Sequence, residues 1–448
     1  MKRLYEGNIL KNFISFSIPL ILASLLAQTH NLVDTVMVSR LIGDNALAAV
    51  GSTSPLLTLI SSMVWGYGAG SAIYVAHLFG MGENERAVNA TKISMLIAAT
   101  ICIIVAIFFV SAHNMIFKVL NISESIEREA FLYFAIYSFG LVFLQMNSAG
   151  VYISNAFGMS RIAFVASAIS CVLNILGNYL LIAVFDLGVT GAAIATVFAA
   201  LVVVIYYLVQ FALIFKRLGS SIRGIRLSAK ELGMNARYGL PNMLQQSVMY
   251  LSTAVVSPLV NMTGTAAIAG YTAGMKIYDV NAAIYQNSNK TITNYVAHCC
   301  GGKKYNLISK GVGIGIIMTM CYLAFPLIPT VFASRHTAAL FFAKDSIPQS
   351  MDYAVFFLKY CMPFVVFNVL NNAFHGIFRG AGSGRYLVYS TLVYAVSRVA
   401  YSYALFPGFG VHGIFAAVAL SWVTEAIFAS IIYFCGLWKS KEHKKMVM

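Results

Sequence analysis

Apolar and polar stretches alternate along the whole chain. Apolar runs of about 18 residues or more recur from one end to the other, and each is long enough to cross a bilayer as a helix. The polar interruptions between them are short. The pattern predicts twelve spans, with ends uncertain by about four residues, over residues 13–39, 49–79, 91–113, 130–156, 162–184, 188–215, 238–262, 270–299, 310–333, 351–377, 386–406 and 410–436.

Composition supports the same fold class. Of the 448 residues, 59% are hydrophobic and 10% are charged, and the mean hydropathy is +0.79. These values exclude an ordinary soluble domain. We therefore expect an all-α polytopic membrane protein with twelve transmembrane helices.

The basic residues gather at one set of helix ends. Five lie at the opposite ends: Arg40, Lys118, Arg128, Arg335 and Lys344. Four fall within or beside apolar spans: Lys276, Lys290, Lys359 and Arg398. The other 21 share one side: Lys2, Arg3, Lys11, Arg86, Lys92, Arg161, Lys216, Arg217, Arg223, Arg226, Lys230, Arg237, Lys303, Lys304, Lys310, Arg379, Arg385, Lys439, Lys441, Lys444 and Lys445. The net charge of +15 thus follows the positive-inside pattern, which predicts cytoplasmic termini and does not indicate nucleic-acid binding.

The chain divides into two similar halves. Its longest polar, basic segment separates spans six and seven, so we expect an N-terminal lobe (1–215), a cytoplasmic linker (216–237) and a C-terminal lobe (238–448). Matching sequences recur at an offset of 221 or 222 residues: Tyr74–His77 with Tyr295–His298, Gly43–Ala48 with Gly264–Ala269, Pro19 with Pro241, and Gly188–Gly191 with Gly410–Gly413. The repeat predicts two six-helix lobes related by a pseudo-two-fold axis along the membrane normal.

A lone carboxylate, Asp34, falls in the first apolar span, with Gln28, Asn31 and Thr35 nearby. Such a group costs at least ~2.5 kcal/mol in a lipid-spanning helix, so it is a candidate for function. The polar neighbours suggest that this helix lines a cavity. The alternative is a structural role, in which Asp34 accepts hydrogen bonds from neighbouring amides and hydroxyls and stabilises the packing of the helices.

Several motifs together resemble one transporter family. They are Pro19…Gln28…Asp34-Thr35…Gly43…Ala46-Leu47-Ala48-Ala49, Asn174-x-x-x-Asn178…Gly188-Val189-x-Gly191…Thr196, Leu240-Pro241, the Gly264–Gly270 turn and Arg379-Gly380-x-Gly382. The combination resembles the multidrug and toxic compound extrusion (MATE) family over nearly the whole chain. The resemblance implies a cation-coupled antiporter that exports organic, often cationic and amphipathic compounds. It implies no enzymatic activity and no cofactor.

The cation site of the resembled family maps onto Asp34, Asn174, Asn178 and Thr196. Asp34, Asn178 and Thr196 each lie six to eight residues from the predicted outer end of a helix, roughly 9–12 Å in depth. A carboxylate with amide and hydroxyl oxygens suits Na⁺, and the same carboxylate can instead take a proton. Interhelical hydrogen bonding is the alternative role for the two asparagines.

The second half lacks the extra acids that some members of that family carry in the seventh and tenth helices. Polar residues there are amides, and we expect Gln245, Gln246 and Asn371, with Gln28 and Asn31 of the first helix, to line a substrate cavity. We therefore expect the coupling of export to the cation to depend on Asp34. Two other charges within spans, Arg398 and Glu425, are expected to pair, the usual fate of buried charge.

The alternatives are a related flippase for lipid-linked oligosaccharides or other lipid-linked precursors, and an integral-membrane enzyme. A flippase for pyrophosphate lipids is expected to line its cavity with several arginines, whereas Arg398 is nearly alone within the spans. No HExxH or GxSxG motif supports an enzyme. The seven cysteines lack metal-ligand spacing. We expect a monomer in the cell membrane, with membrane lipids and small organic cations as partners, and Na⁺ or H⁺ as the coupling ion.

Overall fold

The computed structural model describes residues 3–41, 44–119, 127–221, 224–340, 342 and 348–439. Of residues 30–41 and 44–60, and of a few others at helix ends, it describes the backbone alone. Helices account for nearly all of the described residues, and no strand occurs among them. This follows from the apolar sequence, because a helix satisfies every backbone hydrogen bond within its own segment.

The helices coincide with all twelve predicted spans. Span ten is a broken helix that runs from α12 to α13, and spans eleven and twelve are the two segments of α14 on either side of Gly410, whose φ of 54° interrupts the helix. The first half holds α1 (Ile9–Leu41), α2 (Asp44–Met81), α3 (Asn84–Ser111), α4 (His113–Val119), α5 (Glu127–Ala156), α6 (Ser160–Asn178), η2 (Tyr179–Val184) and α7 (Gly188–Arg217). The second holds α8 (Ala229–Asn261), α9 (Thr265–Gly301), η3 (Tyr305–Leu307), α10 (Ile308–Phe332), α11 (Ser334–Ala339), α12 (Pro348–Phe356), η4 (Phe357–Cys361), η5 (Met362–Phe364), α13 (Val365–Gly380) and α14 (Gly384–Phe434).

Length and hydropathy agree with a membrane location. Among the described residues, eight helices are long and apolar enough to cross a membrane. The chain is an all-α, polytopic membrane protein.

The start of α8 differs from the prediction. This helix begins nine residues before the predicted span, because Ser228 caps it: Ser228 Oγ accepts from the Glu231 N–H over 3.2 Å.

The chain forms two compact units. Unit 1 comprises residues 1–3 and 22–243, and unit 2 comprises residues 4–21 and 244–448. The first part of α1 therefore packs in unit 2, and the first part of α8 packs in unit 1. The described residues of the predicted linker, Lys216–Arg237, lie within unit 1.

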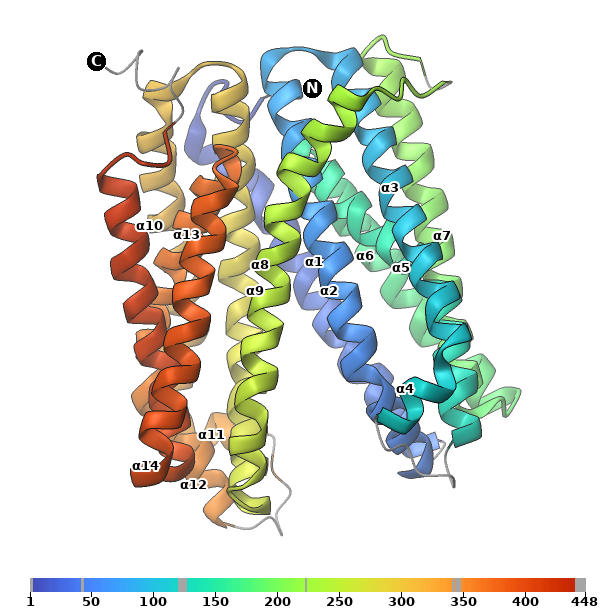
Figure 1. Cartoon of the computed structure of the whole chain (residues 1–448), viewed down its shortest axis with the longest axis vertical. Coiled ribbons are helices and arrows are strands. Elements are labelled where there is room, and N and C mark those ends of the chain that lie inside the picture. Colours follow the sequence, from blue (N-terminus) through green and yellow to red (C-terminus); the bar gives the residue numbers. More distant parts are fainter. Residues whose placement is uncertain are drawn as a thin grey trace. The chain divides into compact units, whose positions relative to one another are not determined.

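Unit 1 is built around α5, which contacts α2, α3 and α7 (Figure 1). Glycines allow the closest approach: a Cβ added at Gly150 would lie 2.5 Å from the Tyr207 ring on α7. Small residues at such crossings let membrane helices pack by van der Waals contact. α7 also packs against α6, which positions the polar residues described below.

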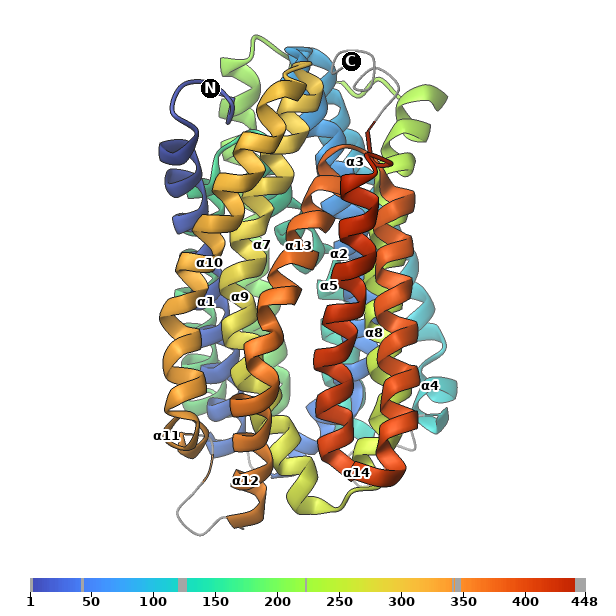
Figure 2. The same cartoon turned by 90° about the vertical axis from the view of Figure 1, so that its left-hand side faces the viewer.

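Unit 2 is built around α9, which contacts α10, α12 and α13 (Figure 2). The N-terminal segment reaches the end of α9, where the Leu4 N–H donates to His298 Nδ1 over 3.3 Å. The C-terminal segment reaches the turn after α13, where Ser383 Oγ donates to the Trp438 carbonyl over 2.6 Å. Because Gly380 at the end of α13 packs against α9 close to that same end, both segments lie at one end of unit 2.

Candidate functional site

Three of the four predicted cation-site residues meet between α6 and α7. Asn178 Nδ2 donates to Asn174 Oδ1 over 3.0 Å, and Asn174 Nδ2 donates to Thr196 Oγ1 over 3.0 Å. Thr196 Oγ1 in turn donates to the Ala192 carbonyl over 3.0 Å. Both asparagines are fully buried. We call Asn174, Asn178 and Thr196 the amide–hydroxyl cluster.

Local backbone features bring this cluster together. The α-helix of α6 gives way to the π-helix η2 directly after Asn178, and single π-helical turns often occur at functional sites. A Cβ at Gly177 would lie 3.0 Å from Ala195, so α6 and α7 approach closely there. That approach sets Asn174 and Thr196 within hydrogen-bonding distance.

The fourth predicted residue, Asp34, belongs to the helical backbone of α1, but its side chain lies outside the described residues, as does that of Asn31. Gln28 is half-buried on the same helix. The amide–hydroxyl cluster itself is neutral and offers amide and hydroxyl oxygens, which are suitable ligands for a hard cation. Among the described residues, no group of three or more His, Cys, Asp or Glu side chains is arranged to hold a metal ion.

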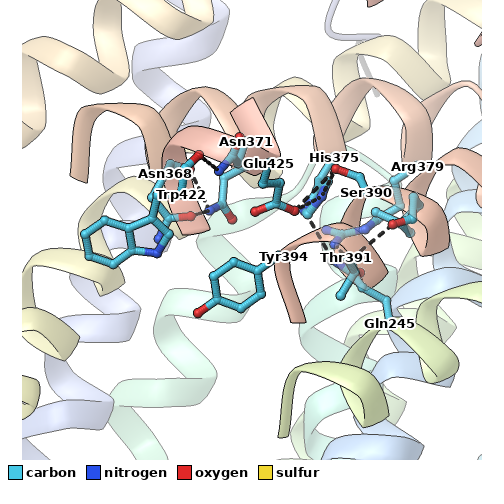
Figure 3. A network of polar contacts seen from close by, with 12 residues as sticks. Gln245, Asn368, Asn371, His375, Arg379, Ser390, Thr391, Tyr394, Trp422 and Glu425 are labelled. Carbon is cyan, nitrogen blue, oxygen red and sulfur yellow. Dashed lines mark hydrogen bonds and ion pairs between the residues drawn. The ribbon is translucent and has the colours of Figure 1, made fainter. Parts of the chain in front are cut away.

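A second polar cluster lies inside unit 2 (Figure 3). His375 Nε2 on α13 lies 3.0 Å from Glu425 Oε1 on α14. Ser390, on the first segment of α14, joins them, with its Oγ 3.2 Å from His375 Nε2 and donating to Glu425 Oε1 over 3.3 Å. His375 is 6% exposed and Glu425 is 3% exposed. The pair is therefore almost completely removed from solvent.

The expected pairing of Arg398 with Glu425 is wrong. Glu425 is bonded to His375 and Ser390 instead. Arg398 Nη1 donates to Thr253 Oγ1 and to the Tyr394 hydroxyl, each over 3.1 Å. The two charged residues lie on different segments of α14. Glu425 contacts His375 on α13, and Arg398 contacts Thr253 on α8.

Two predicted cavity residues are buried inside unit 2. Gln245, on α8, is 3% exposed; its Oε1 accepts from Arg379 Nη2 over 2.8 Å and its Nε2 lies 3.3 Å from His375 Nδ1. Asn371 is fully buried and donates to the Trp422 carbonyl over 2.9 Å. Gln246 is half-buried. Gln245 thus extends the polar cluster of unit 2 onto a third helix.

The sequence did not identify His375 as part of a polar site. The available signal was Glu425, a carboxylate within an apolar span, which implies a buried partner. Spacing could not identify that partner, because His375 lies 50 residues away along the chain, on another helix. The two residues meet through the packing of α13 against α14.

Comparison with known proteins gives one consistent family. The family pattern described as MatE matches residues 19–180 and 241–404. The multidrug export protein MepA of Staphylococcus saprophyticus is 20% identical over 429 residues, which cover 96% of this chain and 94% of the relative. The corresponding protein of Staphylococcus haemolyticus is 20% identical over 440 residues, with the same coverage.

Solved structures share the fold. One is described as an outward-facing multidrug resistance MATE family transporter of the MOP superfamily; it is 21% identical, with a TM-score of 0.89 over 97% of this chain and 98% of that one. Another, a MOP superfamily transporter from Pyrococcus furiosus, is 20% identical, with a TM-score of 0.89 over 98% of this chain and 100% of that one. Its description reports a binding pocket of reversed polarity. At these identities the likeness establishes the fold.

Proposed function

Because the chain belongs to the MatE family of multidrug efflux transporters, we propose that it is a secondary antiporter that exports organic small molecules, amphipathic cations among them, in exchange for Na⁺ or H⁺. The observation that carries the proposal is that relatives named as multidrug export proteins align with 96% of the chain, through both halves. The family consists of transporters rather than enzymes.

The proposed coupling site comprises Asp34 and the amide–hydroxyl cluster. Asn174 and Asn178 place two buried amides within one turn of each other, next to the hydroxyl of Thr196. Neutral oxygens of this kind complete a cation shell around one carboxylate, and the same carboxylate is able to take a proton. Cation binding drives export when the cation and the substrate favour different conformations, since a ligand shifts an equilibrium by its differential affinity.

We propose the cell membrane as its location, with both termini in the cytoplasm. The 21 basic residues at one set of helix ends support this orientation. The placement of Leu4 and Trp438 at the same end of unit 2 supports an even number of spans.

Transport by purified protein in proteoliposomes tests the proposal. When an inward gradient of Na⁺ or H⁺ is imposed, a fluorescent organic cation such as ethidium is expected to leave the vesicles as the coupling ion enters. No net movement of the organic cation is expected when both gradients are collapsed. A fluorescent lipid-linked oligosaccharide serves as the matched second substrate. Movement of that lipid, with no gradient-driven movement of the organic cation, would instead identify a flippase.

A further inference from the structure

Five side chains of unit 2 form one continuous polar network, and all of them except the half-buried Arg379 are buried. It runs from Arg379 on α13 through Gln245 on α8 to His375 on α13, and from there to Ser390 and Glu425 on α14 (Figure 3). Gln245, His375, Ser390 and Glu425 are each at most 6% exposed. We call these five residues the His375 network. Their hydrogen bonds determine where its protons lie.

Arg379 fixes the orientation of the Gln245 amide. A guanidinium group donates hydrogen bonds and accepts none, so the atom that receives Arg379 Nη2 over 2.8 Å must be the amide oxygen. The NH₂ end of Gln245 consequently faces His375 Nδ1 over 3.3 Å. The reversed amide would set its NH₂ group against the guanidinium, donor against donor.

The amide in turn fixes the tautomer of His375. An NH₂ group donates, so His375 Nδ1 must accept and carries no proton. The ring proton therefore lies on Nε2, which faces Glu425 Oε1 over 3.0 Å and Ser390 Oγ over 3.2 Å. An imidazolium would direct a second N–H at the Gln245 NH₂. His375 is thus held neutral, and its contact with Glu425 is a hydrogen bond rather than a pair of opposite charges.

The other charged and titratable groups leave Glu425 without an ionic partner among the described residues. Arg379 is separated from it by Gln245 and His375, and Lys290, on α9, lies within electrostatic range of Arg379. Tyr394 faces Glu425 from the first segment of α14, and its hydroxyl accepts from Arg398. Asp352 of α12 and Lys359 of η4 are exposed. Glu425 has hydrogen-bond donors but no neighbouring positive charge among these residues, and burying a charge without an opposite charge is costly, a cost that uptake of a proton removes.

We propose that Glu425 is a proton-binding residue of unit 2. His375 donates to it as a neutral imidazole, while Gln245 and Arg379 are positioning residues that keep His375 in that form. The proton passes between solvent and the Glu425 carboxylate, and no covalent bond other than O–H is made or broken. Glu425 belongs to unit 2, whereas Asp34 belongs to unit 1. The inference goes beyond the proposed function because protonation of Glu425 is measurable without substrate or gradient.

Infrared difference spectroscopy of the purified protein measures this proton directly. Titration between about pH 4 and about pH 9, which brackets the ordinary values for Glu and His, is expected to show the carbonyl stretch of a protonated carboxylic acid at the acidic end. Exposed carboxyls with ordinary pKa values contribute to the band at the acidic end as well, so Glu425→Gln should remove only the component that comes from this buried carboxyl. Asp352→Asn, which removes an exposed acid of α12 in the same unit, should leave that component unchanged. A band of the same size and shape in Glu425→Gln and in the wild type would overturn the proposal.

Nitrogen NMR of His375 tests the same proposal without relying on a Glu425 variant. The His375 signal is identified among the eight histidines by its loss in His375→Gln. The wild-type ring is expected to be protonated on Nε2 alone. In Gln245→Glu, a carboxylate accepts from both Arg379 and Nδ1, so the ring should gain its second proton. A wild-type imidazolium would overturn the proposal, and neither outcome depends on whether transport is observed.

Discussion

Pro19 and Pro241 hold matching places in the two halves of the chain. Pro19 lies three residues before Leu22, where the chain passes from unit 2 into unit 1, and Pro241 lies three residues before Leu244, where it passes back. The first helix of each half is therefore divided between the units at the same point of the repeat. Each helix begins in the unit formed mainly by the other half.

The orientation of α8 in the membrane is testable with two cysteines at its opposite ends. Lys230, near its start, is exposed, and Met262, just beyond its last residue, is 73% exposed. We expect an impermeant maleimide added to intact cells to label Met262→Cys and to spare Lys230→Cys, because the basic ends face the cytoplasm.

The labelling requires a protein that has no exposed native cysteine. All seven native cysteines are free, and Cys321 and Cys435 are exposed, so both are replaced by serine first. Permeabilised cells supply the positive control, since both engineered cysteines should then react. Labelling of Lys230→Cys in intact cells would contradict the proposed topology.

Packing around the second copy of the repeated Tyr-Val-Ala-His segment predicts a stability difference between two glycines of α10. A Cβ at Gly311 would collide with the Tyr295 ring on α9, whereas a Cβ at Gly313 would meet nothing within 4 Å. Gly311→Ala is expected to destabilise the protein by about 1–3 kcal/mol, the typical effect of overpacking. Thermal unfolding in detergent measures this.

Gly313→Ala is the matched control, because it makes the same change two residues along the same helix. It should leave the melting temperature unchanged or raise it slightly, since alanine favours a helix more than glycine does. Equal losses in the two variants would show that α9 and α10 do not pack as described.

The amide–hydroxyl cluster predicts a graded effect on coupling. Asn178→Ala removes a neutral donor to Asn174 Oδ1. A neutral hydrogen bond contributes about 1 kcal/mol, so we expect apparent cation affinity to fall by a factor of about five while export persists. Ser167→Ala, on the same helix, removes a hydroxyl that bonds to the Ala163 carbonyl of its own helix and should change affinity little. An unchanged affinity in Asn178→Ala would remove this residue from the proposed site.

The helices could be predicted from the sequence because a helix that crosses a bilayer needs a long run of apolar residues. The prediction placed the start of α8 too late, since the residues from Ala229 onward are polar and the segment reads as linker. The Ser228-x-x-Glu231 capping box was the available signal for the earlier start. Hydropathy also gave no indication that α1 and α8 each contribute to both units, because unit membership depends on tertiary packing.

Local spacing explains which polar contacts were predictable. Asn174 and Asn178 are one helical turn apart, so their shared face follows from the sequence. Their grouping with Thr196 was implied by the family resemblance, and the similar depth of these residues along their helices agreed with it. The His375–Glu425 contact joins distant segments, and the preference of Glu425 for His375 over Arg398 depends on side-chain positions that no spacing rule supplies.

The most direct test of the central claim is gradient-driven export by Asp34→Asn in proteoliposomes. Asparagine keeps the size and much of the hydrogen bonding of aspartate but does not ionise, so we expect normal insertion and folding with export abolished under both Na⁺ and H⁺ gradients. Asp186→Asn is the matched control, because Asp186 is an exposed loop residue whose φ of 50° asparagine also tolerates. Export by Asp34→Asn at the wild-type rate under the same gradient would contradict the proposal that Asp34 carries the coupling.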